Sequence, residues 1–130
     1  MFLLETDTLI NIIRQKPNVI ANLEKHKDIP KAFSIISYGE LVYGCRNSPC
    51  MADNFAKLKH FKKYYPIVNL NRLIMDCFGD VKAQLKRVGT PVDDMDLLIG
   101  CTALVMNYTI VTSNVKHFEK IPGLNVVNWM

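Results

Sequence analysis

The chain has 130 residues, of which 49% are hydrophobic and 22% charged, and its formal net charge is +4. This length fits a single domain, residues 1–130, that buries its own core, and the composition excludes a disordered chain. No apolar stretch approaches the ~20 residues of a membrane span, and the opening run Phe2–Leu4 is too short for a secretory leader. We therefore expect a soluble, cytoplasmic domain without a membrane partner, whose mild positive charge permits a nucleic-acid partner but does not require one.

The first half of the chain alternates short apolar runs with helical patterns. The predicted elements are, in chain order, a strand at Phe2–Glu5, helices at Thr8–Gln15 and Asn18–His26, a strand at Ala32–Ile36, and helices at Ser37–Tyr43 and Ala52–Tyr64. Asp7 stands where it can cap the first helix, and Asn47 to Pro49 break the chain after the third helix.

The second half repeats the alternation. The predicted elements are a strand at Ile67–Leu70, a helix at Leu73–Val88, a helix over Leu97–Val105, a strand at Thr109–Thr112 and a weak edge strand at Asn125–Val127. The helix at Leu73–Val88 has the clearest apolar stripe, which includes Val88, and Gly89 ends it. Strands that alternate with helices predict an α/β fold, a parallel sheet of four to five strands covered by helices on both faces.

The four cysteines show no spacing typical of zinc ligands or of a disulfide framework. Three of them, Cys45, Cys77 and Cys101, fall on apolar helix faces. We expect reduced thiols that pack in the interior.

Acids or amides follow apolar runs in four separated places. These places are Leu4–Asp7, Ile36–Glu40, Asp93–Asp96 and Val111–Asn114. In a parallel sheet the helices that follow successive strands begin at one edge, where ligands bind. Each close pair of carboxylates there costs ~3 kcal/mol at ~5 Å and an effective dielectric of ~20, a repulsion that a cation relieves. Oxygen ligands favour Mg²⁺ or Mn²⁺, and N–H groups at helix starts favour phosphate.

Each of these residues also has a purely structural interpretation. Ser37 and Glu40 have the spacing of a capping box, and Asp93 and Asp7 stand where helix caps stand. Carboxylates are also favoured in the first turn of any helix because of its dipole. The combination of four such corners favours a phosphodiesterase site over four separate caps.

Five segments together resemble a PIN-domain ribonuclease, and the greatest similarity is to the VapC toxins of bacterial VapBC toxin–antitoxin modules. The matching segments run in order along the chain: Leu3–Asp7, Ile36–Gly44, Gly89–Val92 with Asp96–Ile99, Ile110–Asn114 with Phe118, and Ile121–Leu124 with Trp129. The resemblance implies a PIN-like three-layer sandwich and an endoribonuclease that hydrolyses RNA with Mg²⁺ or Mn²⁺. It also implies a toxin that forms a homodimer and binds a VapB-type antitoxin, with tRNA or ribosomal RNA as the substrate.

By position, the resemblance implies roles for individual residues. Glu5, Glu40 and Asp96 match the three core acids that hold metal, and Asn114 matches the fourth catalytic position. Thr112 matches a supporting hydroxyl, Asp7 matches a supporting polar position, and Asp93 is placed to add an outer oxygen.

Glu5 departs from the family pattern, in which the first core acid is typically Asp. The extra methylene displaces the carboxylate by ~1.5 Å, whereas catalytic geometry tolerates only ~0.5 Å. Two hypotheses follow: an attenuated nuclease, or a catalytically silent protein that binds the antitoxin in an operon-repressing complex.

RNA contacts are predicted at basic residues beside the acids, namely Lys59, Lys62, Lys63 and Arg46, with Tyr38 and Tyr43 as stacking candidates. The alternative for each lysine is a solvated helix face. The three histidines are scattered along the sequence and are not predicted to be catalysts. A phosphoryl-accepting receiver domain is disfavoured because Asn69 and Asn71, rather than Asp, follow the third strand.

Overall fold

The computed structural model describes residues 1–130 and contains one five-stranded sheet in which every neighbouring pair is parallel. The strand order is β3-β2-β1-β4-β5. The strands are β1 (Phe2–Leu4), β2 (Lys31–Ser34), β3 (Ile67–Val68), β4 (Thr109–Val111) and β5 (Val126–Val127). The predicted α/β class, the parallel sheet and the strand number are confirmed.

Strand β1 lies at the centre of the sheet. Phe2 pairs with Lys31 of β2 on one side and with Thr109 of β4 on the other. Parallel pairing on both sides brings the carboxyl ends of β1, β2 and β4 to one edge, so the residues that follow them meet although they are far apart in sequence.

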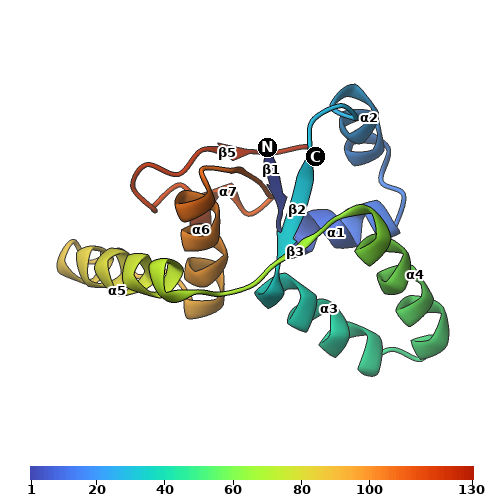
Figure 1. Cartoon of the computed structure of the whole chain (residues 1–130), viewed down its shortest axis with the longest axis horizontal. Helices are drawn as coiled ribbons and strands as arrows, with labels where there is room; N and C mark the ends of the chain where they lie inside the picture. The colour runs from blue at the N-terminus through green and yellow to red at the C-terminus, as the bar shows by residue number, and fades with distance from the viewer.

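Seven helices cover the two faces of the sheet, which gives three layers (Figure 1). They are α1 (Thr6–Ile13), α2 (Pro17–Lys25), α3 (Ile35–Arg46), α4 (Met51–Tyr64), α5 (Arg72–Arg87), α6 (Asp94–Met106) and α7 (Val115–Phe118). In Figure 1 helices α5, α6 and α7 lie to one side of the sheet, and α1, α2, α3 and α4 lie to the other. No helix is both long and apolar enough to cross a bilayer.

Two separate hydrophobic cores lie on opposite faces of the sheet because consecutive strand residues point in opposite directions. Leu3 of β1 belongs to the core beneath α5 and α6, whereas its neighbour Leu4 belongs to the core beneath α1 and α4. Ile110 and Val111 of β4 divide between the two cores in the same way. All four side chains are fully buried, so the sheet is apolar on both faces.

Two helices begin earlier than the sequence predicted, and this changes the role of the acids near their starts. Helix α1 begins at Thr6, and the residue that caps it is Glu5, whose carboxylate accepts from the Asp7 N–H; the prediction that Asp7 caps this helix is wrong. Helix α3 begins at Ile35 and is capped by Ser34, whose hydroxyl accepts from the Ile36 N–H. The capping-box interpretation of Ser37 and Glu40 is therefore wrong.

The second half of the chain follows the prediction more closely. Asn71 caps α5 by accepting from the Ile74 N–H, and Gly89 ends that helix with φ +74°. Val88 was predicted to extend the apolar stripe but is 70% exposed, because it follows the last helical residue. Helix α7, of four residues, was not predicted.

The cysteines are all free thiols, as expected. Cys45 and Cys101 are buried, and burial raises the pKa of the Cys45 thiol. Cys50, in contrast, is exposed just before α4.

Candidate active site

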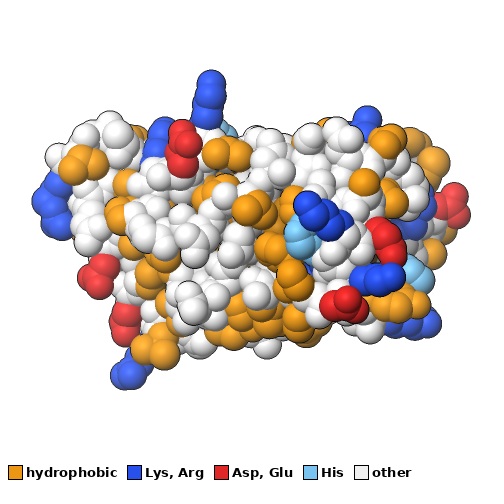
Figure 2. Space-filling model, turned by 90° about the horizontal axis from the view of Figure 1, so that it is seen from above, with side chains coloured by type: hydrophobic (Ala, Val, Ile, Leu, Met, Phe, Trp, Pro, Cys, Tyr) orange, Lys and Arg blue, Asp and Glu red, His pale blue; other side chains and the backbone are white.

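The acidic residues predicted from the four corners gather where β1, β2 and β4 end. Glu5 directly follows β1, Glu40 lies in the second turn of α3 after β2, and Thr112 directly follows β4. Asp96 comes from the first turn of α6, which packs on the same side of the sheet as α5. Figure 2 shows the side of the molecule at the top of Figure 1, where the strands begin, and there the acidic side chains are dispersed.

Glu5 is 4% exposed and is held by its neighbours in sequence and in space. One carboxylate oxygen, Oε2, accepts from the Asp7 N–H at 3.3 Å and from the Thr112 hydroxyl at 3.1 Å. The hydroxyl of Thr112 in turn accepts from the Asn114 N–H at 3.0 Å. Residues 107 positions apart are thereby joined, and Thr112 has the supporting position that the resemblance implied.

Glu5 and Asp7 form a pair of facing carboxyls with opposite pKa shifts. Burial, followed by the hydrogen bond and the charge of Asp7, raises the pKa of Glu5 to about 9. Burial acts in the same direction on Asp7, but hydrogen bonds with Glu5 and Ser113 outweigh it and lower the pKa of Asp7. Both the N–H and the hydroxyl of Ser113 donate to Asp7. The two carboxyls titrate as a pair, in which burial and Asp7 favour the protonated form of Glu5 while the donors around Asp7 favour its ionised form.

Glu40 is attached to the end of β1 through a chain of hydroxyl groups. The buried hydroxyl of Thr6 donates to Glu40 Oε1 at 2.8 Å, and its oxygen lies 3.0 Å from Ser37 Oγ. Burial raises the pKa of Glu40 first, and the charges of Asp96 and Asp93 raise it further. The charges of Asp96 and Asp93 act on Glu40, so the second and third corners lie on neighbouring parts of the molecule.

Asp96 has a partner that the sequence did not reveal. The ring of His117, in α7, places Nδ1 3.1 Å from Asp96 Oδ2, and the Asp96 side chain is 21% exposed. Burial raises the pKa of Asp96, and the carboxylates of Asp93 and Asp7 add to this effect, while His117 opposes it. The only sequence signal for His117 was its place three residues after Asn114, inside a helix too short to be predicted.

Asp93 and Asn114 lie at the margin of this group. Asp93 caps α6 by accepting from the Met95 N–H at 3.1 Å, so the structural interpretation holds for this residue. The exposed Asn114 occupies the cap position of α7, but its side chain makes no capping hydrogen bond. A cavity of about 170 Å³ lies between Asp93, His117 and Lys120, with Pro91 and Val92.

The carboxylate oxygens of Glu5, Glu40 and Asp96 are suitable ligands for a hard divalent cation. Their side chains, however, are not arranged around a common point. Burial and nearby carboxylates raise the pKa of all three acids: Asp7 acts on Glu5, Asp96 and Asp93 act on Glu40, and Asp93 and Asp7 act on Asp96. A bound cation relieves such an environment. No three His, Cys, Asp or Glu side chains, however, lie close enough together to form a ligand set as they stand. Thr112 contacts one Glu5 oxygen and His117 contacts one Asp96 oxygen, so each carboxylate keeps a second oxygen outside these two contacts.

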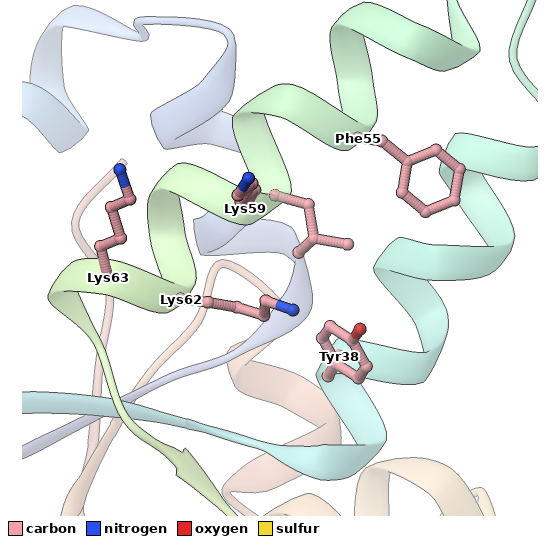
Figure 3. A pocket seen from close by; sticks show the side chains of 6 residues that line it. Tyr38, Phe55, Lys59, Lys62 and Lys63 are labelled. Carbon is pink, nitrogen blue, oxygen red and sulfur yellow. The ribbon is translucent and has the colours of Figure 1, made fainter.

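The two tyrosines that were predicted to stack on RNA bases line two different cavities. Tyr43 is 63% exposed and lines a cavity of about 480 Å³ together with Glu40 and Met95. Tyr38 lines another cavity of about 480 Å³ with Lys59, Lys62 and Lys63 (Figure 3). The guanidinium of Arg46 lies 5.0 Å from the centre of the Phe55 ring.

The other two histidines lie away from the acids, as predicted. His26 stacks on Trp129 with ring centres 5.3 Å apart, and His60 packs against Tyr64 at 4.8 Å. Both contribute to packing between aromatic rings.

Comparison with known proteins places this arrangement in a family. No family model matches the chain. Among curated relatives, the "tRNA(fMet)-specific endonuclease VapC" of Salmonella typhimurium is 30% identical over 128 residues, which is 98% of this chain and 97% of that protein. The "Ribonuclease VapC2" of Rickettsia felis is 31% identical over 133 residues, which is 99% of this chain and 98% of that protein.

Solved structures give the same result. VapBC2 from Rickettsia felis, bound to a DNA fragment from its promoter, aligns with a TM-score of 0.93 and 30% identity over 99% of this chain and 98% of that chain. DNA-bound VapBC from Salmonella typhimurium aligns with a TM-score of 0.91 and 28% identity over 99% and 98%. The PIN-like three-layer sandwich is thus confirmed, and with relatives of at least 30% identity over nearly its full length, the chain belongs to the VapC family of ribonucleases.

Proposed function

We propose that this protein is the toxin of a type II toxin–antitoxin module and acts as a divalent-metal-dependent endoribonuclease. The observation that carries the proposal is that Glu5, Glu40 and Asp96, which come from three separate segments, lie at the carboxyl edge of a parallel sheet in a VapC-family chain. Folded RNA is the proposed substrate, and the similarity to the tRNA(fMet)-specific endonuclease of Salmonella typhimurium favours tRNA over ribosomal RNA.

Glu5, Glu40 and Asp96 are the residues that would hold Mg²⁺ or Mn²⁺, with Asp7, Asp93 and Asn114 as further oxygen donors around them. When bound, the ion acidifies a water molecule and balances the charge of the departing oxygen. The Thr112 hydroxyl holds one Glu5 oxygen, and the other oxygen of Glu5 is the one that would reach the ion.

The chain's own residues prepare the proton transfers. Glu40 Oε1 is fixed by Thr6, while Oε2 makes no hydrogen bond within the chain and is the atom that accepts the proton of the attacking water. The raised pKa of Glu40 strengthens it as a base. His117, 3.1 Å from Asp96, orients that carboxylate.

The proposed partner is a VapB-type antitoxin, and the proposed setting is the cytoplasm. Both structural relatives described above were solved as VapBC complexes on DNA, which supports the antitoxin and an operon-binding role of the complex. A homodimer that assembles further with the antitoxin is part of the same proposal.

An Asp96→Asn variant tests the site assignment. Because it removes one ligand charge at the acidic edge, we expect metal-dependent cleavage of a labelled tRNA transcript to fall by at least about 100-fold. Asp94→Asn is the matched control, since Asp94 lies in the same helical turn and pairs only with Lys82 at the surface. Full cleavage by Asp96→Asn in matched Mg²⁺ or Mn²⁺ would show that the assignment is incorrect.

A second candidate function, a catalytically silent antitoxin-binding protein, is favoured by one observation. Glu5 is buried, accepts a hydrogen bond from Thr112 and has a raised pKa. These features indicate a structural role for its carboxyl group, which a metal ligand does not require. Glu5→Asp shortens this side chain by one methylene and separates the two candidates. A gain of at least about 10-fold in RNA cleavage indicates an attenuated nuclease, whereas two equally inactive proteins indicate a scaffold.

A further inference from the structure

A basic cavity between α3 and α4 is separate from the acidic residues. Its volume is about 480 Å³, and its walls are Tyr38 of α3 together with Phe55, Leu58, Lys59, Lys62 and Lys63 of α4. Figure 3 shows Lys62 reaching from α4 toward the Tyr38 ring, while Phe55 projects toward α3 farther along the cavity. Leu58 is only 3% exposed, so the floor of the cavity is firmly packed.

The lysines of this cavity carry uncompensated charge. None of Lys59, Lys62 and Lys63 has a carboxylate within 4.0 Å, whereas Lys27 and Lys82, elsewhere on the surface, both form ion pairs. Three ammonium groups on consecutive turns of one helix form a concentrated positive surface that favours a polyanion.

Tyr38 adds a flat aromatic surface to this charge. The Lys62 ammonium lies 5.5 Å from the centre of the Tyr38 ring, a cation–π contact that fills the ring face in the absence of a ligand. A lysine on its flexible stem exchanges this contact readily for a phosphate, and the ring face is then free for another planar group.

Helix α3 connects this cavity to the acidic edge. Tyr38 directly follows Ser37, whose hydroxyl meets Thr6, and Tyr38 precedes Glu40 by two residues. Tyr38 and Glu40 are separated by only ~3 Å along the helix axis, but at ~100° per residue they point to different sides of α3 and line different cavities. A strand that runs from the cavity to the acids therefore passes around this helix.

We propose that the cavity is a subsite for one unpaired nucleotide of the RNA substrate, next to but outside the bond that is cut. The base stacks on Tyr38, and its flanking phosphates contact Lys62 and Lys59. Holding this nucleotide fixes the register of the strand, and therefore selects which phosphodiester bond reaches Glu40 and Asp96. The inference rests on the proposed function for the identity of the polyanion.

RNA fits this cavity better than an acidic peptide does. A nucleotide carries a planar base and a phosphate within one repeating unit, which matches one ring beside several ammonium groups. An acidic peptide would use the lysines but would leave the ring face without a counterpart, so Tyr38 distinguishes the two ligands.

The test measures binding without cleavage. A fluorescein-labelled 12-nucleotide single-stranded RNA is titrated with the full chain in EDTA, and anisotropy gives Kd. We expect Tyr38→Leu to weaken binding about 5- to 100-fold, Tyr38→Phe to bind within about twofold of the parent, and Lys62→Gln to reduce the slope of log K against log salt by about 0.7.

Lys57→Gln is the matched control, because Lys57 belongs to the same helix but lines a different cavity with Ile13 and His60. We expect its Kd to stay within about twofold of the parent value. Because Tyr38 packs partly against the core, the thermal unfolding midpoint of the Tyr38→Leu variant is measured as well. Lys62 is exposed, so Lys62→Gln provides an independent test if Tyr38→Leu does not fold.

A series of RNAs that each lack one base locates the nucleotide. If the proposal is correct, the penalty of Tyr38→Leu disappears for one abasic position and persists for the others. If the penalty is the same at every position, or if Tyr38→Leu and Lys62→Gln bind like Lys57→Gln, the subsite is excluded. An acidic peptide would be the better ligand if Lys62→Gln lost poly-glutamate binding while Tyr38→Leu left RNA binding unchanged. That result would overturn the nucleotide subsite.

Cleavage of the same RNA separates this inference from the proposed function. If the parent cuts and the subsite variants bind and cut at the same position as the control, the subsite fails while the nuclease stands. If the parent does not cut but its binding depends on Tyr38 and one base, the subsite stands while the nuclease fails. A spread of cut positions in Tyr38→Leu supports both.

Discussion

At the scale of single residues, Glu5 is the most constrained acid of the site. It caps α1, accepts from Thr112 and faces Asp7, all while 4% exposed. The sign of its pKa shift has a consequence for stability. Because the pKa of Glu5 is higher in the folded chain than in the unfolded one, the folded chain binds more protons between the two values, and the free energy of unfolding falls as the pH rises.

We predict that Glu5→Gln stabilises the metal-free protein at pH 8. The amide is neutral at every pH, so the chain no longer has to take up a proton at this position when it folds at pH 8, and we expect a gain of about 1–3 kcal/mol in the free energy of unfolding. Urea unfolding of both proteins at pH 5 and pH 8 measures this difference, which shrinks toward pH 5, close to the ~4.3 of an unperturbed glutamate.

Glu119→Gln is the control for this prediction, since Glu119 is exposed after α7. It removes the same formal charge without a buried partner and is expected to change stability by less than ~0.5 kcal/mol. An unchanged pH dependence in Glu5→Gln would show that Glu5 does not hold its proton in the fold.

Glu5 and Glu40 could be predicted from the sequence because each follows a short apolar strand, and this pattern is local. Their contacts could not be predicted for the same reason. The strand before Glu40 ends two residues earlier than expected, which moves the cap to Ser34 and leaves Glu40 to meet Thr6. The expectation that Asp96 also follows a strand is wrong, since α6 comes after α5 with no strand between them. The role of His117 depends on a contact between residues 21 positions apart, and no periodic pattern marks such a contact.

At the scale of elements, the position of α6 depends on a close approach at Gly100. This buried glycine faces the segment after α7, and a methyl group on it would overlap the Cδ1 atom of Ile121, which is 2% exposed. Helix α6 carries Asp96, so its distance from the sheet also sets the position of that carboxylate.

We predict that Gly100→Ala destabilises the protein by about 1–3 kcal/mol, because the methyl group overpacks a well-filled contact. Thermal unfolding followed by circular dichroism measures the loss. Ile121→Val removes the atom that would clash and is expected to restore part of the stability in the double variant.

Gly44→Ala on α3 is the matched control, since nothing lies within 4 Å of an added methyl group there. This change is expected to be neutral or to stabilise by up to ~1 kcal/mol through helix propensity. If the two alanine variants have the same stability, the close approach at Gly100 has no energetic weight.

Most elements were predictable because their apolar residues repeat with a clear period, as in α5. The exceptions have physical reasons. Helix α7 has only four residues, which is barely one turn and leaves no room for a period, and its position is set by the burial of Phe118. Strand β3 has only two residues and is defined by pairing with β2, which a local pattern does not report.

At the scale of the whole molecule, one sheet separates two cores and also joins them. Adjacent residues of β1 and β4 are divided between the cores, so neither core can be lost while the other keeps its strands. The only tryptophan, Trp129, is 5% exposed and belongs to the core beneath α1 and α4.

We predict that the two cores unfold in one step. Val81→Ala, a cavity-forming change in the core beneath α5 and α6, is expected to cost about 1–3 kcal/mol. Urea unfolding followed by Trp129 fluorescence, which reports on the opposite core, should shift by the same amount as unfolding followed by circular dichroism. Separate midpoints for the two signals would show that the cores are independent.

The central position of β1 has a consequence for how this protein folds during its synthesis on the ribosome. Its first strand needs β4 as a neighbour, and Glu5 needs Thr112, so a nascent chain that has not yet reached that threonine has neither partner. A partly translated molecule thus contains most of the acids but cannot assemble them. The cell that makes this RNA-cutting chain is exposed to its chemistry only after the ribosome has added β4 and Thr112.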